Sequence, residues 1–190
     1  MRKLIAAAAL LATGFAAQAA PEVYELEGTH VHPQFSILHM GYSTTTGGFT
    51  KTTGTVTLDM AKKTGAVDIT IDANSLQTAV PKLDEHLKNE DFFDVAKYPT
   101  ITYKSSKLNF EGDKLVSVDG DLTLHGVTKP VQLTVTHFAC GEHPFFKKPH
   151  CGADAVATIK RSEFGISKYS PTGASEEVKI NIQIEATKKK

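Results

Sequence analysis

The stretch "VKINIQIEA" at residues 178–186 alternates strictly between apolar and polar side chains. A valine and three isoleucines occupy the even-numbered positions from 178 to 184, and lysine, asparagine, glutamine and glutamate lie between and after them. Successive side chains of a β-strand point to opposite faces, so this pattern predicts a strand with one dry face and one wet face. The dry face must contact a filled core, a second sheet or a cavity that holds something other than protein.

The same period-two signal recurs along the chain and bounds the fold class. Seven further strand-like stretches lie at residues 34–41, 54–60, 66–73, 100–110, 114–126, 131–138 and 154–166. Clusters of Gly, Pro, Asn, Asp or Lys separate many of them, which is typical of an antiparallel sheet with one buried face. We interpret "GVTKP" at 126–130 as a hairpin turn and the Thr- and Gly-rich stretch 44–54 as a turn at a strand edge.

One region breaks the strand pattern. In "PKLDEHLKNEDFFDVAKYP", Leu83 and Leu87 lie at helical spacing, so we expect one short helix over residues 83–89. A second turn should hold Phe92 and Phe93, and Pro99 should return the chain to an extended conformation.

Eight strands and one short helix predict an all-β protein in which the sheet closes into an extended eight-stranded antiparallel barrel. The interior of such a barrel is just wide enough for its own side chains or for one small ligand. The chain has no Trp, and its inward candidates are mostly medium-sized aliphatic residues: Val67, Ile69, Ile71, Val131, Leu133, Val135, Val178, Ile180, Ile182 and Ile184. Periodicity alone leaves two alternatives open, an apolar cavity or a core filled by the helix and the Phe residues.

The first 19 residues have the pattern of a cleavable secretory signal peptide. Arg2 and Lys3 precede an apolar run from Leu4 to Ala16, and Ala17-Gln18-Ala19 follows as a cleavage signal. The apolar run is shorter than the roughly 20 residues that a membrane span needs. We therefore expect export and a single mature domain over residues 20–190.

Charge and cysteine content restrict the partners. The chain carries 21 basic and 21 acidic residues, and no basic patch indicates a nucleic-acid partner. Cys140 and Cys151 should form a disulfide in an oxidising compartment. Closing the loop between them should stabilise the folded state by about 3 kcal/mol. A zinc site that combines these cysteines with His143 and His150 is the alternative.

Four stretches in this order and spacing resemble the YceI-like family of exported bacterial proteins. They are "FSILHMGYSTTTGGF", "DEHLKNEDFFDVAKYP", "GDLTLHGVTKPV" and "IKRSEFGI". The resemblance implies an extended lipocalin-like barrel in the periplasm that encloses a long isoprenoid lipid, such as an isoprenoid quinone of the ubiquinone type or a polyprenyl phosphate. The family often has Arg before the Asp of "RDxHL", whereas Leu83 precedes Asp84 here. That departure favours a neutral headgroup.

The resemblance also implies a set of residues around the lipid, with no catalytic group, no metal and no cofactor other than the bound lipid. We expect the wall to comprise Phe35, Ile37, His39, Phe49, Val67, Ile69, Ile71, Leu87, Phe92, Phe93, Tyr98, Ile101, Tyr103, Leu122, Leu124, Leu133, Phe164, Ile166, Ile180 and Ile182. A buried His39 imidazole would hydrogen-bond a quinone carbonyl or a neighbouring backbone group. We expect Asp84 and His86 to cap or orient the helix, with a ligand contact as the alternative.

Two rival functions remain open at this level. His30 and His32 have the HxH spacing of some metal sites, which would suit a metal-dependent periplasmic enzyme. A stress-induced interaction module with a ligand-free barrel is the other rival. The sequence also leaves open a homodimer through strand edges or the cysteine loop, and transient contact with a membrane.

Overall fold

The computed structural model describes residues 20–189, which form eleven strands, one α-helix and three short 3₁₀ helices. The strands are β1 (Glu22–Leu26), β2 (Gln34–His39), β3 (Ser43–Phe49), β4 (Thr52–Asp59), β5 (Thr64–Asp72), β6 (Leu76–Gln77), β7 (Thr100–Glu111), β8 (Lys114–Leu124), β9 (Val127–Glu142), β10 (Pro149–Lys160) and β11 (Ala174–Lys188). The helices are α1 (Pro81–Lys88), η1 (Gly28–His30), η2 (Ala73–Ser75) and η3 (Arg161–Phe164). The signal peptide expected at 1–19 lies outside the described residues.

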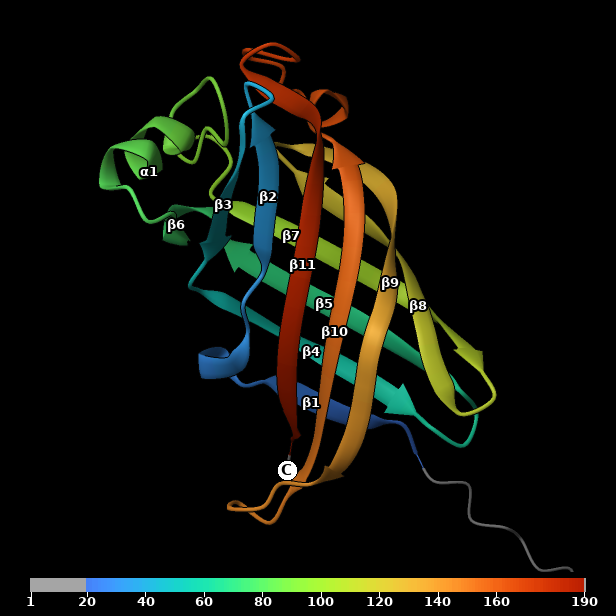
Figure 1. Ribbon diagram of the computed structural model, residues 1–190. Helices are drawn as coiled ribbons and strands as arrows, with labels where there is room; N and C mark the ends of the chain where they lie inside the picture. Colours follow the sequence, from blue (N-terminus) through green and yellow to red (C-terminus); the bar gives the residue numbers. More distant parts are fainter. Residues whose placement is uncertain (1–19, 190) are drawn as a thin grey trace, which may run out of the picture.

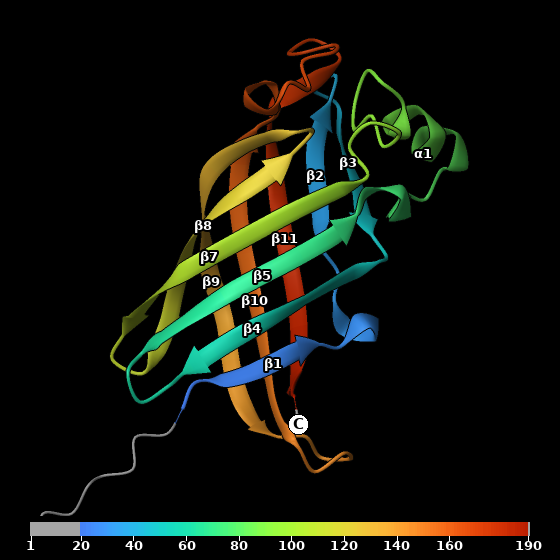
Figure 2. The ribbon, with the colours of Figure 1, turned by 180° about the vertical axis from the view of Figure 1, so that it is seen from behind.

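Eight of the strands close into an antiparallel barrel, which confirms the predicted fold class (Figure 1). The ring runs β1-β4-β5-β7-β8-β9-β10-β11, and Leu26 of β1 pairs with Ala186 of β11 to complete it. Viewed from behind, β1, β4, β5 and β7 cross the barrel obliquely (Figure 2). In the part of the chain that the structure describes, no helix is long and apolar enough to span a membrane.

Two different strands pair with one edge of β11, each along a different part of its length. Its end at residues 186–188 pairs with β1, whereas residues 174–181 pair with β2. β2 leads to β3, which pairs only briefly with β6 at Gly48 and Phe49. Beside β3, the segment 78–98, which contains α1, covers the edge of the strand through side chains such as Phe93. The Phe93 ring lies 5.6 Å from the Phe49 ring.

β1 and β3 were not predicted from the sequence, and the interpretation of 44–54 as a turn was wrong. This stretch forms most of β3 and the start of β4. The two glycines of β3 gave no strand signal in the sequence, yet they are what lets the strand pair closely with β2. A Cβ atom on Gly47 would lie 2.5 Å from the Phe35 ring, so a larger residue could not be accommodated there without a shift.

The hairpin between β8 and β9 is tighter than expected. The chain turns through only His125 and Gly126, with φ angles of 52° and 75°, and "VTKP" already belongs to β9. Positive φ at both central residues is the signature of a two-residue turn that matches the twist of the flanking strands. Glycine at position 126 tolerates this backbone conformation without strain.

The helical region follows the prediction closely. α1 spans Pro81–Lys88 where 83–89 was expected, and Phe92 and Phe93 lie in the turn that follows. Asp84 accepts hydrogen bonds at 2.6 Å from both the backbone N–H and the hydroxyl of Thr78. Asp84 therefore orients the start of the helix, as the sequence indicated.

The region after the cysteine loop contains one confirmed prediction and one wrong one. Cys140 and Cys151 face each other on β9 and β10 and form the predicted disulfide. The strand expected over 154–166 instead ends at Lys160 and continues as η3, which Gly165 terminates with φ of 79°. Phe164 consequently lies in a 3₁₀ helix and not on a strand.

Asp119 of β8 connects three neighbouring strands through its carboxylate. It accepts hydrogen bonds from Lys107 Nζ at 2.8 Å, Gln132 Nε2 at 2.7 Å and Asn109 Nδ2 at 3.1 Å. These donors, led by Lys107, hold the pKa of Asp119 well below its ordinary value. A depressed folded-state pKa adds stability above the unfolded value of about 4, and this stability is lost as the pH falls toward the folded pKa.

We therefore expect the melting temperature to fall as the pH drops from about 5 to about 2, with a shallower fall in Asp119→Asn, because asparagine carries no ionisable proton site. Circular dichroism melts at a series of pH values measure both slopes. Equal slopes for the two proteins would contradict this account of Asp119.

Candidate functional site

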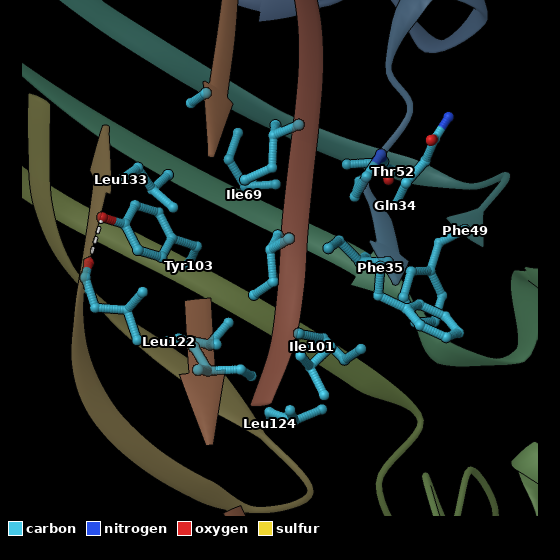
Figure 3. Close-up of a pocket in the computed structure, with 18 of the residues that line it drawn as sticks. Gln34, Phe35, Phe49, Thr52, Ile69, Ile101, Tyr103, Leu122, Leu124 and Leu133 are labelled. Atoms are coloured by element: carbon cyan, nitrogen blue, oxygen red, sulfur yellow. Dashed lines mark hydrogen bonds between the residues drawn. The ribbon is translucent and has the colours of Figure 1, made fainter. Parts of the chain in front are cut away.

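An apolar cavity of about 690 Å³ occupies the interior of the barrel and decides between the two alternatives left open by the sequence. All ten inward candidates, from Val67 to Ile184, line it. The β10 wall contributes mostly small residues, among them Gly152, Ala153 and Ala155. These side chains are too short to meet across the axis, so the interior stays hollow (Figure 3).

The cavity extends along most of the barrel. It is lined near the disulfide by Cys151 and Ala186, and at the other end by Met40, His86 and Tyr169. Met40 and Tyr169 are 57% and 56% exposed, so this end opens to the surface. The mouth therefore lies between the β2–β3 turn, the loop before β11 and α1, at the end of the barrel where α1 sits in Figure 1.

The buried phenol of Tyr103 in the wall has its hydrogen-bond partners within the protein. The hydroxyl of Tyr103 lies 3.0 Å from the Val118 carbonyl oxygen and 2.9 Å from that of Val131. Burial, with a smaller effect of Asp119 and Asp121, raises the pKa of Tyr103. The phenol therefore stays neutral, and the part of it that faces the cavity is the ring.

Arg161 is the one lysine or arginine among the described cavity residues, and four of the five N–H groups of its guanidinium donate to backbone carbonyl oxygens. It is only 4% exposed and donates to the carbonyl oxygens of four residues that frame the mouth loop. These acceptors are Ser175 at 2.9 Å, Ile166 at 3.2 Å, Lys168 at 2.9 Å and Ala174 at 3.2 Å. Burial lowers the pKa of Arg161, whereas Glu176 acts in the opposite direction. Arg161 organises the rim and has little capacity left for a ligand.

The structure places eighteen of the twenty expected wall residues on the cavity. The two exceptions are Tyr98 and Phe164. The Tyr98 ring packs at a tilt against His125, with 4.5 Å between the ring centroids, and lies close against Gly126 of the β8–β9 turn. Phe164 is 1% exposed in the core beneath η3. Contact of the other eighteen with a ligand stays a prediction.

His39 lines the cavity but is exposed at the end of β2, so the expectation of a buried imidazole was wrong. The strand alternation placed it correctly on the inner face, but the strand ends there at the mouth. His86 is likewise exposed at the mouth, where its ring packs on Phe92 at 4.7 Å.

Sequence reasoning missed several wall residues in the strands that it did not recognise or did not follow to their ends. Tyr24 of β1, Thr45 of β3 and Thr52 of β4 come from stretches that were not assigned as strands. Leu108 and Val118 lie in predicted strands, and their alternation with polar neighbours could have indicated them.

The alternative metal sites do not fit the geometry. Both sulfur atoms of the suggested zinc site are joined to each other in the disulfide. His30 lies in η1, with Nδ1 2.5 Å from Glu27 Oε2, and not on a strand beside His32. Across residues 20–189, no three His, Cys, Asp or Glu side chains are arranged to hold a metal ion.

A closed antiparallel barrel around an apolar cavity defines the class of small barrels that enclose one ligand. The YceI-like domain family matches residues 24–186, and the chain belongs to that family. Protein YceI of Salmonella arizonae is 38% identical over 185 residues, which cover 96% of this chain and 95% of that protein.

Solved structures with this fold agree with that assignment. The crystal structure of BcnA from Burkholderia cenocepacia superposes with a TM-score of 0.71 at 26% identity, covering 85% of this chain and 99% of that one. A polyisoprenoid binding domain from Saccharophagus degradans gives a TM-score of 0.66 at 18% identity, covering 87% and 98%. At that identity the second likeness shows the fold alone.

Proposed function

We propose that this protein binds a long isoprenoid lipid, an isoprenoid quinone of the ubiquinone type, and carries or stores it in the periplasm. The observation that supports this most is the continuous apolar cavity of about 690 Å³ with one exposed end. The volume falls in the usual range of about 300–1,000 Å³ for ligand sites. The fold is also that of a polyisoprenoid binding domain from another bacterium.

The energetics favour a chain-like apolar ligand. Each CH₂ group transferred from water to an apolar wall contributes about 0.8 kcal/mol, so several isoprene units supply a large gross gain. Ordering and association offset much of it. The free energy that remains is enough to keep such a ligand bound in water. An isoprenoid lipid needs a protein of this kind in order to leave a membrane.

The wall chemistry supports an uncharged headgroup. Among the described residues that line the cavity there is no Lys, Asp or Glu, and the guanidinium of Arg161 is occupied by backbone carbonyls. Leu83 lies on the wall directly before Asp84, where the family often has Arg. A diphosphate would meet no free cation inside this cavity, whereas a quinone needs none.

The Cys140–Cys151 disulfide supports an oxidising compartment, in agreement with export. Within that compartment we propose a binding role and not a catalytic one. The described wall residues include no Ser and no free Cys, and the buried polar groups of Tyr24, Tyr103 and Arg161 form hydrogen bonds within the protein.

Solvent extraction of the purified full chain followed by mass spectrometry tests the proposal. We expect an isoprenoid quinone at close to one molecule per protein after expression in a quinone-producing bacterium. In parallel, apoprotein prepared by unfolding and refolding should take up added ubiquinone, detected by native mass spectrometry. An extract that holds only fatty acids or phospholipids, together with no uptake of ubiquinone, would contradict the proposal.

A further inference from the structure

Two phenylalanine side chains lie exposed at the tip of the β9–β10 hairpin. Phe145 is 85% exposed and Phe146 is 66% exposed. Every other phenylalanine in residues 20–189 is buried or half-buried. Adjacent large apolar side chains that stay in water mark a surface that a partner molecule or a membrane covers.

Hydrogen bonds hold this tip in one conformation. His143 Nδ1 accepts hydrogen bonds at 3.2 Å from the backbone N–H groups of both Phe145 and Phe146. The His143 N–H donates to the Lys148 carbonyl oxygen at 2.8 Å, and the Lys147 N–H donates to the His143 carbonyl oxygen at 2.9 Å. The His143 ring also stacks on the Phe146 ring, with 4.5 Å between the ring centroids. A defined turn therefore presents the two phenylalanine rings to the outside.

Two lysines follow the rings directly, and the tip 143–148 contains no acidic residue. Lys147 and Lys148 are both exposed. Lys147 Nζ lies 3.5 Å from Glu142 Oε1 at the end of β9, and among the ion pairs of residues 20–189 none involves Lys148. Exposed apolar rings beside basic side chains are typical of segments that lie in the interface of an anionic membrane.

The acidic side chains closest to the hairpin on the neighbouring strands have basic partners of their own. Glu22 Oε1 lies 2.6 Å from Lys188 Nζ, and Glu185 Oε2 lies 3.1 Å from His150 Nε2. The exposed charge of the tip is therefore that of its two lysines.

The hairpin lies at the end of the barrel opposite the mouth. In both views the connection from β9 to β10 is at the far end of the molecule from α1 (Figures 1 and 2). The Cys140–Cys151 disulfide joins the two strands just below the tip. A surface that holds the tip therefore leaves the mouth unobstructed.

We propose that the tip 143–148 docks on a lipid bilayer that contains anionic lipid. The rings of Phe145 and Phe146 enter the boundary between the headgroups and the acyl chains, and Lys147 and Lys148 lie against the anionic headgroups. This docking is independent of the ligand that the barrel cavity holds.

Vesicle co-sedimentation tests the docking, with every protein expressed from the full chain and purified from the periplasm in the same way. The probes are vesicles of phosphatidylglycerol mixed with phosphatidylcholine, and vesicles of phosphatidylcholine alone. One double variant combines Phe145→Ser with Phe146→Ser, and the other combines Lys147→Gln with Lys148→Gln.

Matched controls make the same kinds of change elsewhere on the surface. Tyr42→Ser removes an aromatic ring that is 90% exposed at the other end of the barrel. A double variant of Lys160→Gln with Lys179→Gln removes two exposed lysines from β10 and β11.

We expect the wild type to bind the mixed vesicles about tenfold more tightly than vesicles of phosphatidylcholine alone. Each double variant of the tip should bind the mixed vesicles about tenfold more weakly than the wild type, from lost apolar burial in one and lost charge in the other. The controls should stay within about twofold of the wild type, and all melting temperatures should stay near that of the wild type, because the substituted side chains are exposed.

The absence of tryptophan from the chain allows a second measurement. Phe146→Trp places a single indole at the tip, and its fluorescence emission should shift to shorter wavelength when the mixed vesicles are added. Tyr42→Trp is the control and should show no shift.

Equal binding of the mixed vesicles by the wild type and the double phenylalanine variant overturns the proposal, as does an unshifted emission from Phe146→Trp. A wild type that binds no vesicles and sediments as a dimer, with the double phenylalanine variant a monomer, also overturns it. In that case a second copy of the chain covers the tip.

Discussion

Replacing Arg161 with methionine should lower the free energy of unfolding by about 3–5 kcal/mol, because the change leaves one buried and three partly buried carbonyl oxygens without their donor. Those oxygens belong to Ile166, Lys168, Ala174 and Ser175, which frame the loop between η3 and β11. Methionine fills a similar volume but donates no hydrogen bond. The loop should therefore lose its fixed shape even where the barrel stays folded.

Urea unfolding followed by circular dichroism measures this effect. Lys160→Met, at the exposed position beside Arg161, is the matched control and should change stability by less than about 0.5 kcal/mol. Arg161→Lys should be intermediate, because an ammonium group cannot span the four acceptors that the planar guanidinium reaches. A loss below about 1 kcal/mol in Arg161→Met would contradict the role that we assign to this side chain.

Replacing Ile69 or Ile182 with phenylalanine should sharply reduce the amount of bound lipid while the protein stays folded. Both residues line the cavity, from β5 and β11 respectively. A larger ring at either position would project into space that the lipid occupies. In a hollow interior such a ring meets free volume, so the usual overpacking penalty of about 1–3 kcal/mol should be small.

Lipid content after extraction and the melting temperature are the two measurements. We expect occupancy to fall at least several-fold, with a melting temperature near that of the wild type. Gln183→Phe adds the same ring at an exposed position next to Ile182 and should leave occupancy unchanged. Unchanged occupancy in both cavity variants would mean that these walls do not touch the lipid.

The long strands could be predicted from the sequence because their periodicity reflects a physical asymmetry between the two faces of the wall. Along β11 every second residue from Val178 to Ile184 lines the cavity, and these are the apolar residues of the alternating sequence. β3 could not be found in this way. Its "STTTGGF" has one large apolar residue, Phe49 at its end, so the strand that pairs with β2 shows no period-two alternation in the sequence.

Most of the wall residues could also be predicted from strand periodicity. The wrong and missing predictions lie where a strand ends or where its sequence does not alternate. Tyr98 and Phe164 are aromatic and buried or half-buried, but periodicity does not tell core from cavity once a strand ends. Thr52 could not be predicted as a wall residue, because one threonine in a Thr-rich stretch does not differ from its neighbours. Only the closure of the sheet shows that Thr52 lies on the cavity wall.

The shared strand β11 also determines how evenly the barrel resists opening. Around most of the ring, neighbouring strands hold one another through ladders of backbone bonds. Beside β3 the residues of 78–98 close the wall instead, through side chains such as Leu87, Phe92 and Phe93. Packed side chains part locally, whereas a ladder must break along its length. We therefore expect the wall to open first beside β3, before any pair of strands separates.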